Sequence, residues 1–516
     1  MVYTKLVYTN LDPTNEGQAM DTPEATAQHS AAQTGTRMKR ELGLYASFAV
    51  AFGFVSIATG IFTAYGAVLN SSGPRGIWAW PIAVIGQTMV ALIFGALAAR
   101  IPISGYAYQW VSRLANPILG WLTGWVSFAF LVIVVVAVDY TIAATILPEL
   151  FGYVPTAANC WVITAIVMLL QAILVALSTK VTNRVNEVAV TVQIIGMIGI
   201  TVLLFVVGAW LGRLDFSQLF ATAPIAEAAY WDFGGLTEVG PFPLAFLLGA
   251  FTIVGFESAA NLAEETKNPE RVIPRAMVQA VIALGVLGML FLIAVTALVG
   301  DATELAKSAT PVATVITSVL GPVVGKGLLV LVVISIFSCG LVITLSGTRL
   351  IWAMSRDERF PAWQLLRKVS RSRRTPVAAT IGYFIITQTI LAIFSGTSDA
   401  LFILFSAATL LPAIIYASTV LLYIVKRKSL PASKGFTLGR WEVPVLVLAS
   451  IWLVYELLIF RDASFEQPRL YVGIMLVIGI AYLVYLVATR GRKGLTMPDM
   501  QDVDRVFDED TATTAQ

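Results

Sequence analysis

Twelve long apolar runs constrain this chain more than any other feature of its sequence. Each run is long enough to cross the roughly 30 Å hydrocarbon layer of a bilayer as a helix. Only 13% of the residues are charged, which is about half of the share typical of a soluble protein. We therefore predict an all-α integral membrane protein with 12 transmembrane helices. The runs cover residues 44–69, 78–99, 118–147, 161–179, 187–210, 242–263, 275–299, 327–352, 376–395, 400–425, 443–460 and 471–489.

The composition also argues against several kinds of chemistry. The chain has one histidine, His29, and two cysteines, Cys160 and Cys339, which are far apart in the sequence. These residues cannot supply a zinc site, a haem attachment or a disulfide framework. The run 321–327 comes nearest to an ATP-binding loop, but its spacing is wrong and no Ser or Thr follows the lysine. The net charge of +3 is too small to indicate a nucleic-acid partner. Together, these observations lead us to expect no nucleic-acid partner, cofactor, metal or enzymatic activity.

The Lys and Arg residues predict how the chain is oriented in the membrane. Positive flanks stay on the cytoplasmic side, so both termini are expected to be cytoplasmic, in a multi-pass protein of the cytoplasmic (plasma) membrane. Seven cations lie at 355–375, where we favour an ordinary determinant of topology over a segment that contacts anionic lipid. Most Lys and Arg residues flank one set of alternate loops, at 37–40, 100–113, 180–184, 267–275, 356–374, 426–440 and 490–493.

The first and sixth spans both carry small and hydroxyl residues in mid-membrane, at 53–66 and 249–261. Transporters with inverted repeats interrupt a matching pair of helices near the midplane to form their binding sites. An alternative is that Gly and Ser only allow close helix packing. Because both segments stand at matched positions, we favour two interrupted helices.

Interrupted helices would leave main-chain groups without partners in the bilayer. The amides of residues 58–61 stand at a positive dipole end and suit a carboxylate. The carbonyls of Ser56, Phe251 and Val254 suit an ammonium group. This polarity predicts a zwitterionic or cationic amine as the substrate.

Glu257 is the most informative single residue, because an ionisable group within a span is costly and often marks a pathway or a proton relay. We interpret it as the proton-coupling residue, with a neutral core glutamate as the alternative. Asp139, toward the outer end of span 3, and Glu456, near an interface in span 11, are weaker candidates. Glu187 is explained by a local pair with Arg184, and we assign Glu264 and Glu265 to gating or loop anchoring.

With these residues, the chain resembles the amino acid–polyamine–organocation superfamily of secondary transporters over about residues 40–490. The branch that transports amino acids, 4-aminobutyrate and choline is the most similar. The resemblance rests on the stretches 56–62, 102–110 with 120–125, 255–269, and 349–357.

The resemblance implies a LeuT-like fold: a five-plus-five inverted repeat with discontinuous helices 1 and 6, and a substrate cradle formed by spans 1, 3, 6 and 8. The parts would be a disordered cytoplasmic tail (1–40), a first repeat (41–210), an extracellular loop (211–241), a second repeat (242–428), helices 11 and 12 (429–490) and a cytoplasmic tail (491–516). The implied substrate-binding residues are Ser56, Ile57, Ala58, Thr59, Gly60, Phe251, Val254, Gly255 and Ile343.

Within that set, the resemblance implies particular roles. Thr59 and Gly60 would offer amides to a carboxylate, Phe251 would be an aromatic lid and gate, and Ile343 would line the far wall. Glu257 matches an acidic residue implicated in proton dependence.

The chain departs from the family's pattern at two positions. Ala58 replaces the first glycine of the break, and Gln193 stands where many proton-coupled relatives carry a lysine. Coupling would then rest on Glu257, or a cation would bind between span 1 carbonyls and hydroxyls such as Thr344 or Ser346.

We therefore predict a permease that imports an amino acid or a related amine such as 4-aminobutyrate, by proton symport with alternating access; sodium remains the alternative coupling ion. An obligate exchanger and a carrier for choline or polyamines would share the same residues. A sensor or channel that kept the fold is the alternative from another class.

Overall fold

Twelve helices in the described residues are long and apolar enough to cross a membrane, which confirms the all-α class and the number of spans. The structure is a computed structural model that describes residues 40 and 42–491, except 236, 309, 371, 372, 374, 396–399 and 434. The tails predicted from the sequence, 1–40 and 491–516, fall outside this range apart from Arg40 and Gly491.

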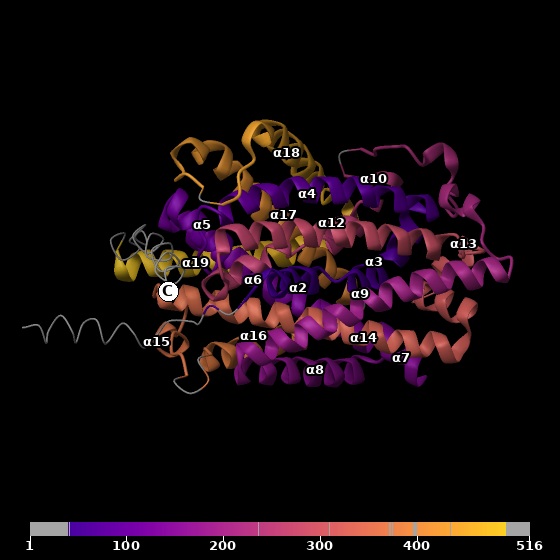
Figure 1. The fold of residues 1–516 in the computed structure, drawn as a ribbon, viewed down its shortest axis with the longest axis horizontal. Helices are drawn as coiled ribbons and strands as arrows, with labels where there is room; N and C mark the ends of the chain where they lie inside the picture. The colour runs from indigo at the N-terminus through magenta and orange to yellow at the C-terminus, as the bar shows by residue number, and fades with distance from the viewer. Residues whose placement is uncertain are drawn as a thin grey trace, which may run out of the picture. The chain divides into compact units, whose positions relative to one another are not determined.

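In chain order (Figure 1), the spans are α2 (Leu44–Val55) with α3 (Ile57–Ser72); η1 (Pro74–Trp78) with α4 (Ala79–Ala98); α6 (Pro117–Thr141) with the π-helical turn η2 (Ile142–Ile146) and α7 (Leu147–Phe151); α8 (Ala157–Leu177); α9 (Thr179–Trp210); α10 (Pro241–Ala245) with α11 (Leu247–Thr252) and the 3-10 helix η5 (Phe256–Glu265); α12 (Pro269–Thr296); α14 (Pro311–Arg356); α16 (Val377–Phe394); α17 (Ala400–Lys426); α18 (Glu442–Ile459); and α19 (Glu466–Arg490). Short helices α5 (Tyr106–Leu114), α13 (Ala302–Ala306) and α15 (Trp363–Leu366) lie between spans.

The fifth and eighth spans begin well before their apolar runs. The fifth begins at Thr179 instead of 187, because a polar first stretch continues the helix beyond the apolar run. The eighth begins at Pro311 instead of 327 and has 46 residues, with a kink at Gly321 (φ 79°) before Pro322. At 1.5 Å per residue, the part after the kink, from Pro322 to Arg356, is about 50 Å long and extends beyond the hydrocarbon layer.

The interrupted helices lie at the centre of the molecule. The apolar stretches of the first and sixth spans are 78% and 83% buried inside the protein, whereas that of the twelfth span is 22% buried. The apolar side chains of the outer helices therefore face lipid. The main-chain breaks are protected from lipid, as unpaired backbone groups require.

Two short helices between spans lie at opposite ends of the molecule. The short helix α5 follows the second span and α13 follows the seventh, and Figure 1 shows them at opposite ends. Inverted repeats require this arrangement, since one repeat is turned over relative to the other.

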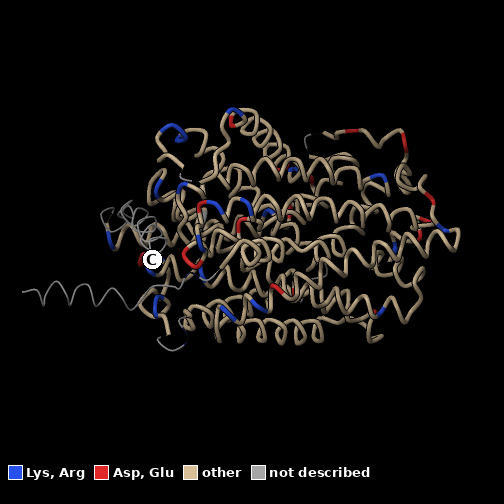
Figure 2. The backbone as a smooth tube through the Cα atoms, in the orientation of Figure 1, with Lys and Arg blue, Asp and Glu red and all other residues tan. Residues whose placement is uncertain are grey.

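Basic side chains gather at the end of the molecule that carries α5 and α15, on the left of Figure 2. We call this the basic end. Leu42 joins the first and sixth spans there: its N–H donates to the carbonyl of Glu265 at 3.0 Å, and its carbonyl accepts from the N–H of Lys267 at 2.9 Å. The start of α2 is thereby fixed to the end of η5.

Candidate functional site

The first span is interrupted at Ser56, which has a positive φ of 35°. This residue caps the second half-helix: its Oγ accepts hydrogen bonds from the N–H of Thr59 at 3.3 Å and the hydroxyl of Thr59 at 2.8 Å. On the other side of the break, the thiol of Cys339 on α14 donates to the carbonyl of Phe54 at 2.9 Å. Polar side chains therefore satisfy part of the main chain that the break exposes.

The sixth span is interrupted at Ile253–Gly255. Helix α11 ends at Thr252, and η5 begins after Gly255, which adopts a left-handed conformation (φ 87°) that glycine accepts without strain. The N–H of Gly255 donates to the hydroxyl of Tyr416 on α17 at 3.0 Å. Both predicted breaks are therefore present, and each is capped by a side chain.

The two breaks pack against each other through glycines. A Cβ at Gly60 would collide with the side chain of Thr252, and a Cβ at Gly255 would collide with the ring of Phe54. Each glycine thus allows the other span's half-helix to approach. The close contact explains why small residues stand at both positions.

A small cavity of about 20 Å³ lies where the breaks meet. This volume is enough for about one water molecule. The cavity is lined by Phe54, Val55, Thr59, Gly60, Val134, Val138, Phe251, Thr252, Val254, Cys339, Ile343 and Ala408. We call it the inner cavity.

A vestibule of about 910 Å³ lies on the side of Phe251 away from the basic end. Phe251 lines both the vestibule and the inner cavity, and its ring stacks on Phe405 of α17. Side chains from the outer ends of several spans line the vestibule, among them Asn70, Ser71 and Thr156. Phe251 therefore separates a wide vestibule from a nearly filled inner cavity.

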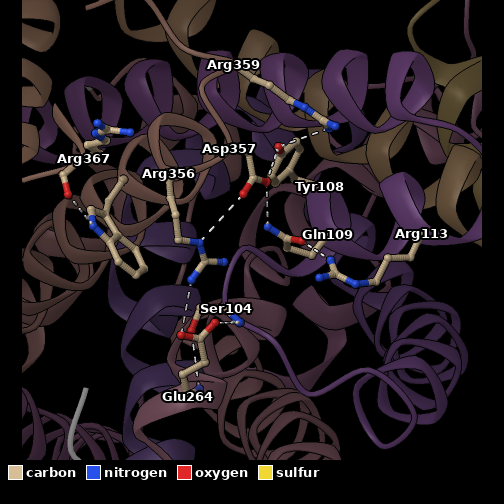
Figure 3. A network of polar contacts seen from close by, with 10 residues as sticks. Ser104, Tyr108, Gln109, Arg113, Glu264, Arg356, Asp357, Arg359 and Arg367 are labelled. Carbon is tan, nitrogen blue, oxygen red and sulfur yellow. Dashed lines mark hydrogen bonds and ion pairs between the residues drawn. The ribbon is translucent and has the colours of Figure 1, made fainter. Parts of the chain in front are cut away.

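A polar network joins α5, η5 and the end of α14 at the basic end (Figure 3). Asp357 accepts hydrogen bonds from the hydroxyl of Tyr108 at 2.6 Å and from Gln109 at 3.3 Å. Arg356 pairs with Glu264 at 3.6 Å, and Glu264 accepts from the N–H of Ser104 at 3.2 Å. This network links the three elements around the basic end of the helix core.

A deeper ion pair lies beside this network. The guanidinium of Arg349 is 3.1 Å from the carboxylate of Glu265, and both side chains are almost fully buried. Arg349 also donates to the hydroxyl of Thr179 at 2.6 Å, at the start of α9. Glu264 and Glu265 thus both anchor the end of η5 to α14, and Arg349 extends this link to α9.

Comparison with known proteins decides the family. A family model described as amino acid permease matches residues 42–489 of the chain. The chain belongs to the amino acid permease family. Similar proteins include Amino-acid permease BAT1 of Arabidopsis thaliana, 24% identical over 81% of this chain and 84% of the relative. Amino-acid permease 2 of Neurospora crassa is 26% identical over 82% of this chain and 79% of the relative. This permease is therefore a multi-pass transporter of amino acids or amines, and not an enzyme.

The structure brings five of the residues predicted to bind substrate together around the inner cavity of the permease. They are Thr59, Gly60, Phe251, Val254 and Ile343. The amides of Thr59 and Gly60 are already bonded in this conformation. The N–H of Thr59 donates to the side chain of Ser56, and the N–H of Gly60 donates to the carbonyl of Ser56 at 3.1 Å. Helix geometry instead leaves the amides of Ile57 and Ala58 without a partner within the helix.

The other four predicted residues lie outside the lining of the inner cavity. Ser56 caps the half-helix, Ile57 is fully buried, and Gly255 packs on Phe54. Ala58 lines a separate cavity of about 10 Å³. Its methyl group is therefore not part of the inner cavity's lining.

Gln193 borders the same separate cavity on α9. Its Nε2 donates to the hydroxyl of Ser56 at 3.4 Å, and the hydroxyl of Ser335 on α14 is 3.2 Å from that of Ser56. The span 8 hydroxyl that reaches the first break is therefore Ser335. Thr344, one of the hydroxyls named for the alternative cation site, contacts Oε1 of Gln171 at 3.4 Å.

Glu257 lies behind the sixth break and not in the inner cavity. It is buried, and its Oε2 accepts a hydrogen bond of 2.6 Å from the hydroxyl of Tyr416, the same hydroxyl that caps Gly255. Asp139 and Glu456 are also fully buried. Glu187 pairs with Arg184 at 3.3 Å, as predicted.

Sequence reasoning missed several residues that shape the site of the permease. Phe405 stacks on Phe251, Cys339 bonds the first break, and Tyr416 joins the second break to Glu257. A tyrosine within the apolar run of span 10, four residues after Pro412, was the signal available for Tyr416. No such signal distinguished Phe405 from its apolar neighbours.

Proposed function

We propose that this permease imports an amino acid or a 4-aminobutyrate-like amine across the plasma membrane by proton symport, with both termini in the cytoplasm. The observation that carries the proposal is the meeting of two interrupted helices at an inner cavity, with a vestibule above it and a polar network below it. Alternating access requires one side to be accessible while the other is closed. With the basic end assigned to the cytoplasm, the conformation described above is the one that receives solute from outside.

The polarity of the breaks supports an amine that also carries a carboxylate. The amides of Ile57 and Ala58 begin a half-helix and suit an anionic group. The carbonyls at the end of α11, near Phe251 and Val254, suit an ammonium group. The inner cavity is too small for such a solute as it stands, so binding requires Phe251 to move from Phe405 and then to close over the solute.

The position of Glu257 supports a role in coupling. Tyr416 accepts a hydrogen bond from Gly255 and donates one to the carboxylate of Glu257. Protonation of Glu257 removes the negative charge that attracts the tyrosine hydroxyl. The change reaches the backbone of the break through Tyr416, so proton binding would alter the shape of the substrate site.

Proteoliposomes loaded with buffer and given an inward pH gradient test the proposal. We expect accumulation of a tritiated amino acid mixture supplemented with 4-aminobutyrate, and loss of accumulation when the gradient is dissipated. Uptake that ignores the gradient refutes proton symport. Uptake that occurs only when the vesicles contain unlabelled substrate indicates obligate exchange instead.

A matched pair of variants tests the coupling residue. Glu257→Gln keeps an oxygen that accepts from Tyr416 but cannot titrate. Glu456→Gln changes another fully buried carboxyl, which accepts from Gln87 on α4 at 3.4 Å and is not at either break. We expect Glu257→Gln to lose pH-dependent accumulation of the solute but to retain solute exchange. Glu456→Gln should keep both activities. Wild-type pH dependence in Glu257→Gln would contradict the assignment.

A further inference from the structure

A second buried carboxyl lies inside the membrane, near the inner cavity but outside its lining. Asp139 of α6 is fully buried, and its Oδ1 accepts a hydrogen bond of 2.8 Å from Nε2 of Gln171 on α8. The other carboxyl oxygen, Oδ2, is buried and has no hydrogen-bond partner within the described part of the chain. Neither residue lines the inner cavity or the vestibule. A solute in these cavities therefore does not contact this carboxyl.

Helix α14 holds Gln171 in place. Nε2 of Gln171 also donates to the carbonyl of Phe337 at 3.2 Å, and its Oε1 accepts from the hydroxyl of Thr344 at 3.4 Å. Gly340 lies between these two positions, and a Cβ there would collide with both Asp139 and Gln171. The pair is therefore fitted into the junction of three helices, with one carboxyl oxygen unused.

The neighbours of Asp139 on α6 face the two cavities. Val138 lines the inner cavity and Tyr140 lines the vestibule. Three residues after Asp139, the helix widens into the π-helical turn Ile142–Ile146. Such turns occur frequently at functional sites. The carboxyl thus stands at the level where the accessible and the closed parts of the pathway meet.

An ionised carboxylate at this position would have no counter-charge. Within the described residues, Asp139 forms no ion pair, and its one hydrogen-bond donor is the neutral Gln171 of α8. The titratable groups that face it are Cys339 of α14 and Tyr383 of α16. Thiols and phenols are ordinarily uncharged near neutral pH.

A lone charge inside the membrane is costly, and one hydrogen bond does not offset the loss of water. A positive species must therefore accompany the carboxylate. Since neither cavity exposes Oδ2 of Asp139, the proton is the cation small enough to bind it.

We propose that Asp139 is a second proton-binding residue of the transport cycle, separate from Glu257, with Gln171 holding one carboxyl oxygen while the other binds the proton. The proton binds while the vestibule is open and is released to the opposite side as the solute is carried. This inference rests on the proposed proton symport and adds one coupled proton to it.

Asp139→Asn tests the proposal in proteoliposomes, with Glu456→Gln as the matched buried control. Asparagine keeps the oxygen that accepts from Gln171 but does not titrate. Each coupled proton contributes about tenfold to the accumulation ratio at a gradient of one pH unit. We therefore expect the accumulation ratio of the tritiated amino acid mixture supplemented with 4-aminobutyrate to fall by about tenfold in Asp139→Asn, with exchange retained and Glu456→Gln unchanged.

An unchanged accumulation ratio in Asp139→Asn overturns the inference and leaves proton symport intact. Wild-type protein that ignores the gradient refutes symport itself, and this inference with it. If Asp139→Asn does not fold, infrared titration of the wild type and Gln171→Leu decides. A protonated carboxyl band that shifts when the amide donor is removed supports the proposal, and identical spectra overturn it.

Discussion

Replacement of Gly255 by alanine tests the packing of the two breaks most directly. The φ of 87° places this residue in the left-handed region, which costs an alanine about 1–2 kcal/mol. The added methyl group would also collide with the ring of Phe54. Overpacking of a buried site costs about 1–3 kcal/mol more. We expect the free energy of unfolding to fall by about 2–5 kcal/mol in total.

Gly152→Ala is the matched control. Gly152 also has a positive φ, 72°, but a Cβ there would meet no atom within 4 Å. The control should therefore lose only the backbone part, about 1–2 kcal/mol. Denaturant titration of both variants in mixed micelles, followed by tryptophan fluorescence, measures the difference between the two.

A double-mutant cycle with Phe54→Ala isolates the contact itself. Removal of the ring should cancel the collision, so the loss caused by Gly255→Ala should be about 1–3 kcal/mol smaller in the Phe54→Ala background. Equal losses in the two backgrounds, or equal losses in Gly255→Ala and Gly152→Ala, would refute the idea that the breaks fit against each other through this glycine.

Two further predictions concern charged groups. Glu265→Gln removes the charge that faces the buried guanidinium of Arg349, and we expect the free energy of unfolding to fall by about 3 kcal/mol in the same titration. Glu358→Gln, in a half-exposed ion pair, should lower it by less than about 1 kcal/mol. Similar losses in the two variants would contradict the burial argument. Burial alone would raise the pKa of Asp462, but hydroxyl and backbone N–H donors and a nearby arginine outweigh burial and lower the pKa. Its contribution to stability is therefore present above the unfolded pKa of about 3.9 and is lost as the pH falls through the lower folded pKa. Asp462→Asn should flatten the acid limb of a plot of the free energy of unfolding against pH. An unchanged acid limb would contradict this prediction.

The spans and the two breaks could be predicted from the sequence because each depends on properties that act locally. A run of about 20 apolar residues favours a membrane-spanning helix whatever its neighbours are. Glycine and hydroxyl residues in mid-span indicate where a helix can be interrupted, and both breaks occur where 53–66 and 249–261 predicted them. The fifth span begins earlier than predicted because its helix continues past the apolar region that hydropathy detects, and the eighth because another helix meets it at the Gly321 kink.

The tertiary structure alone decided what each site residue contacts. The sequence indicated that Glu257 was unusual, but only the packing of α17 against η5 placed Tyr416 between Glu257 and Gly255. In the same way, Ser56 caps its own half-helix, which occupies the amides of Thr59 and Gly60 and leaves those of Ile57 and Ala58 without a partner within the helix. Transfer from water to lipid is a property of one residue at a time, whereas a hydrogen bond or a stacked ring requires two residues that folding brings together from distant parts of the chain. For this reason the sequence determined that the chain spans the membrane and where it breaks, and the packing of the helices determined which groups meet at the breaks.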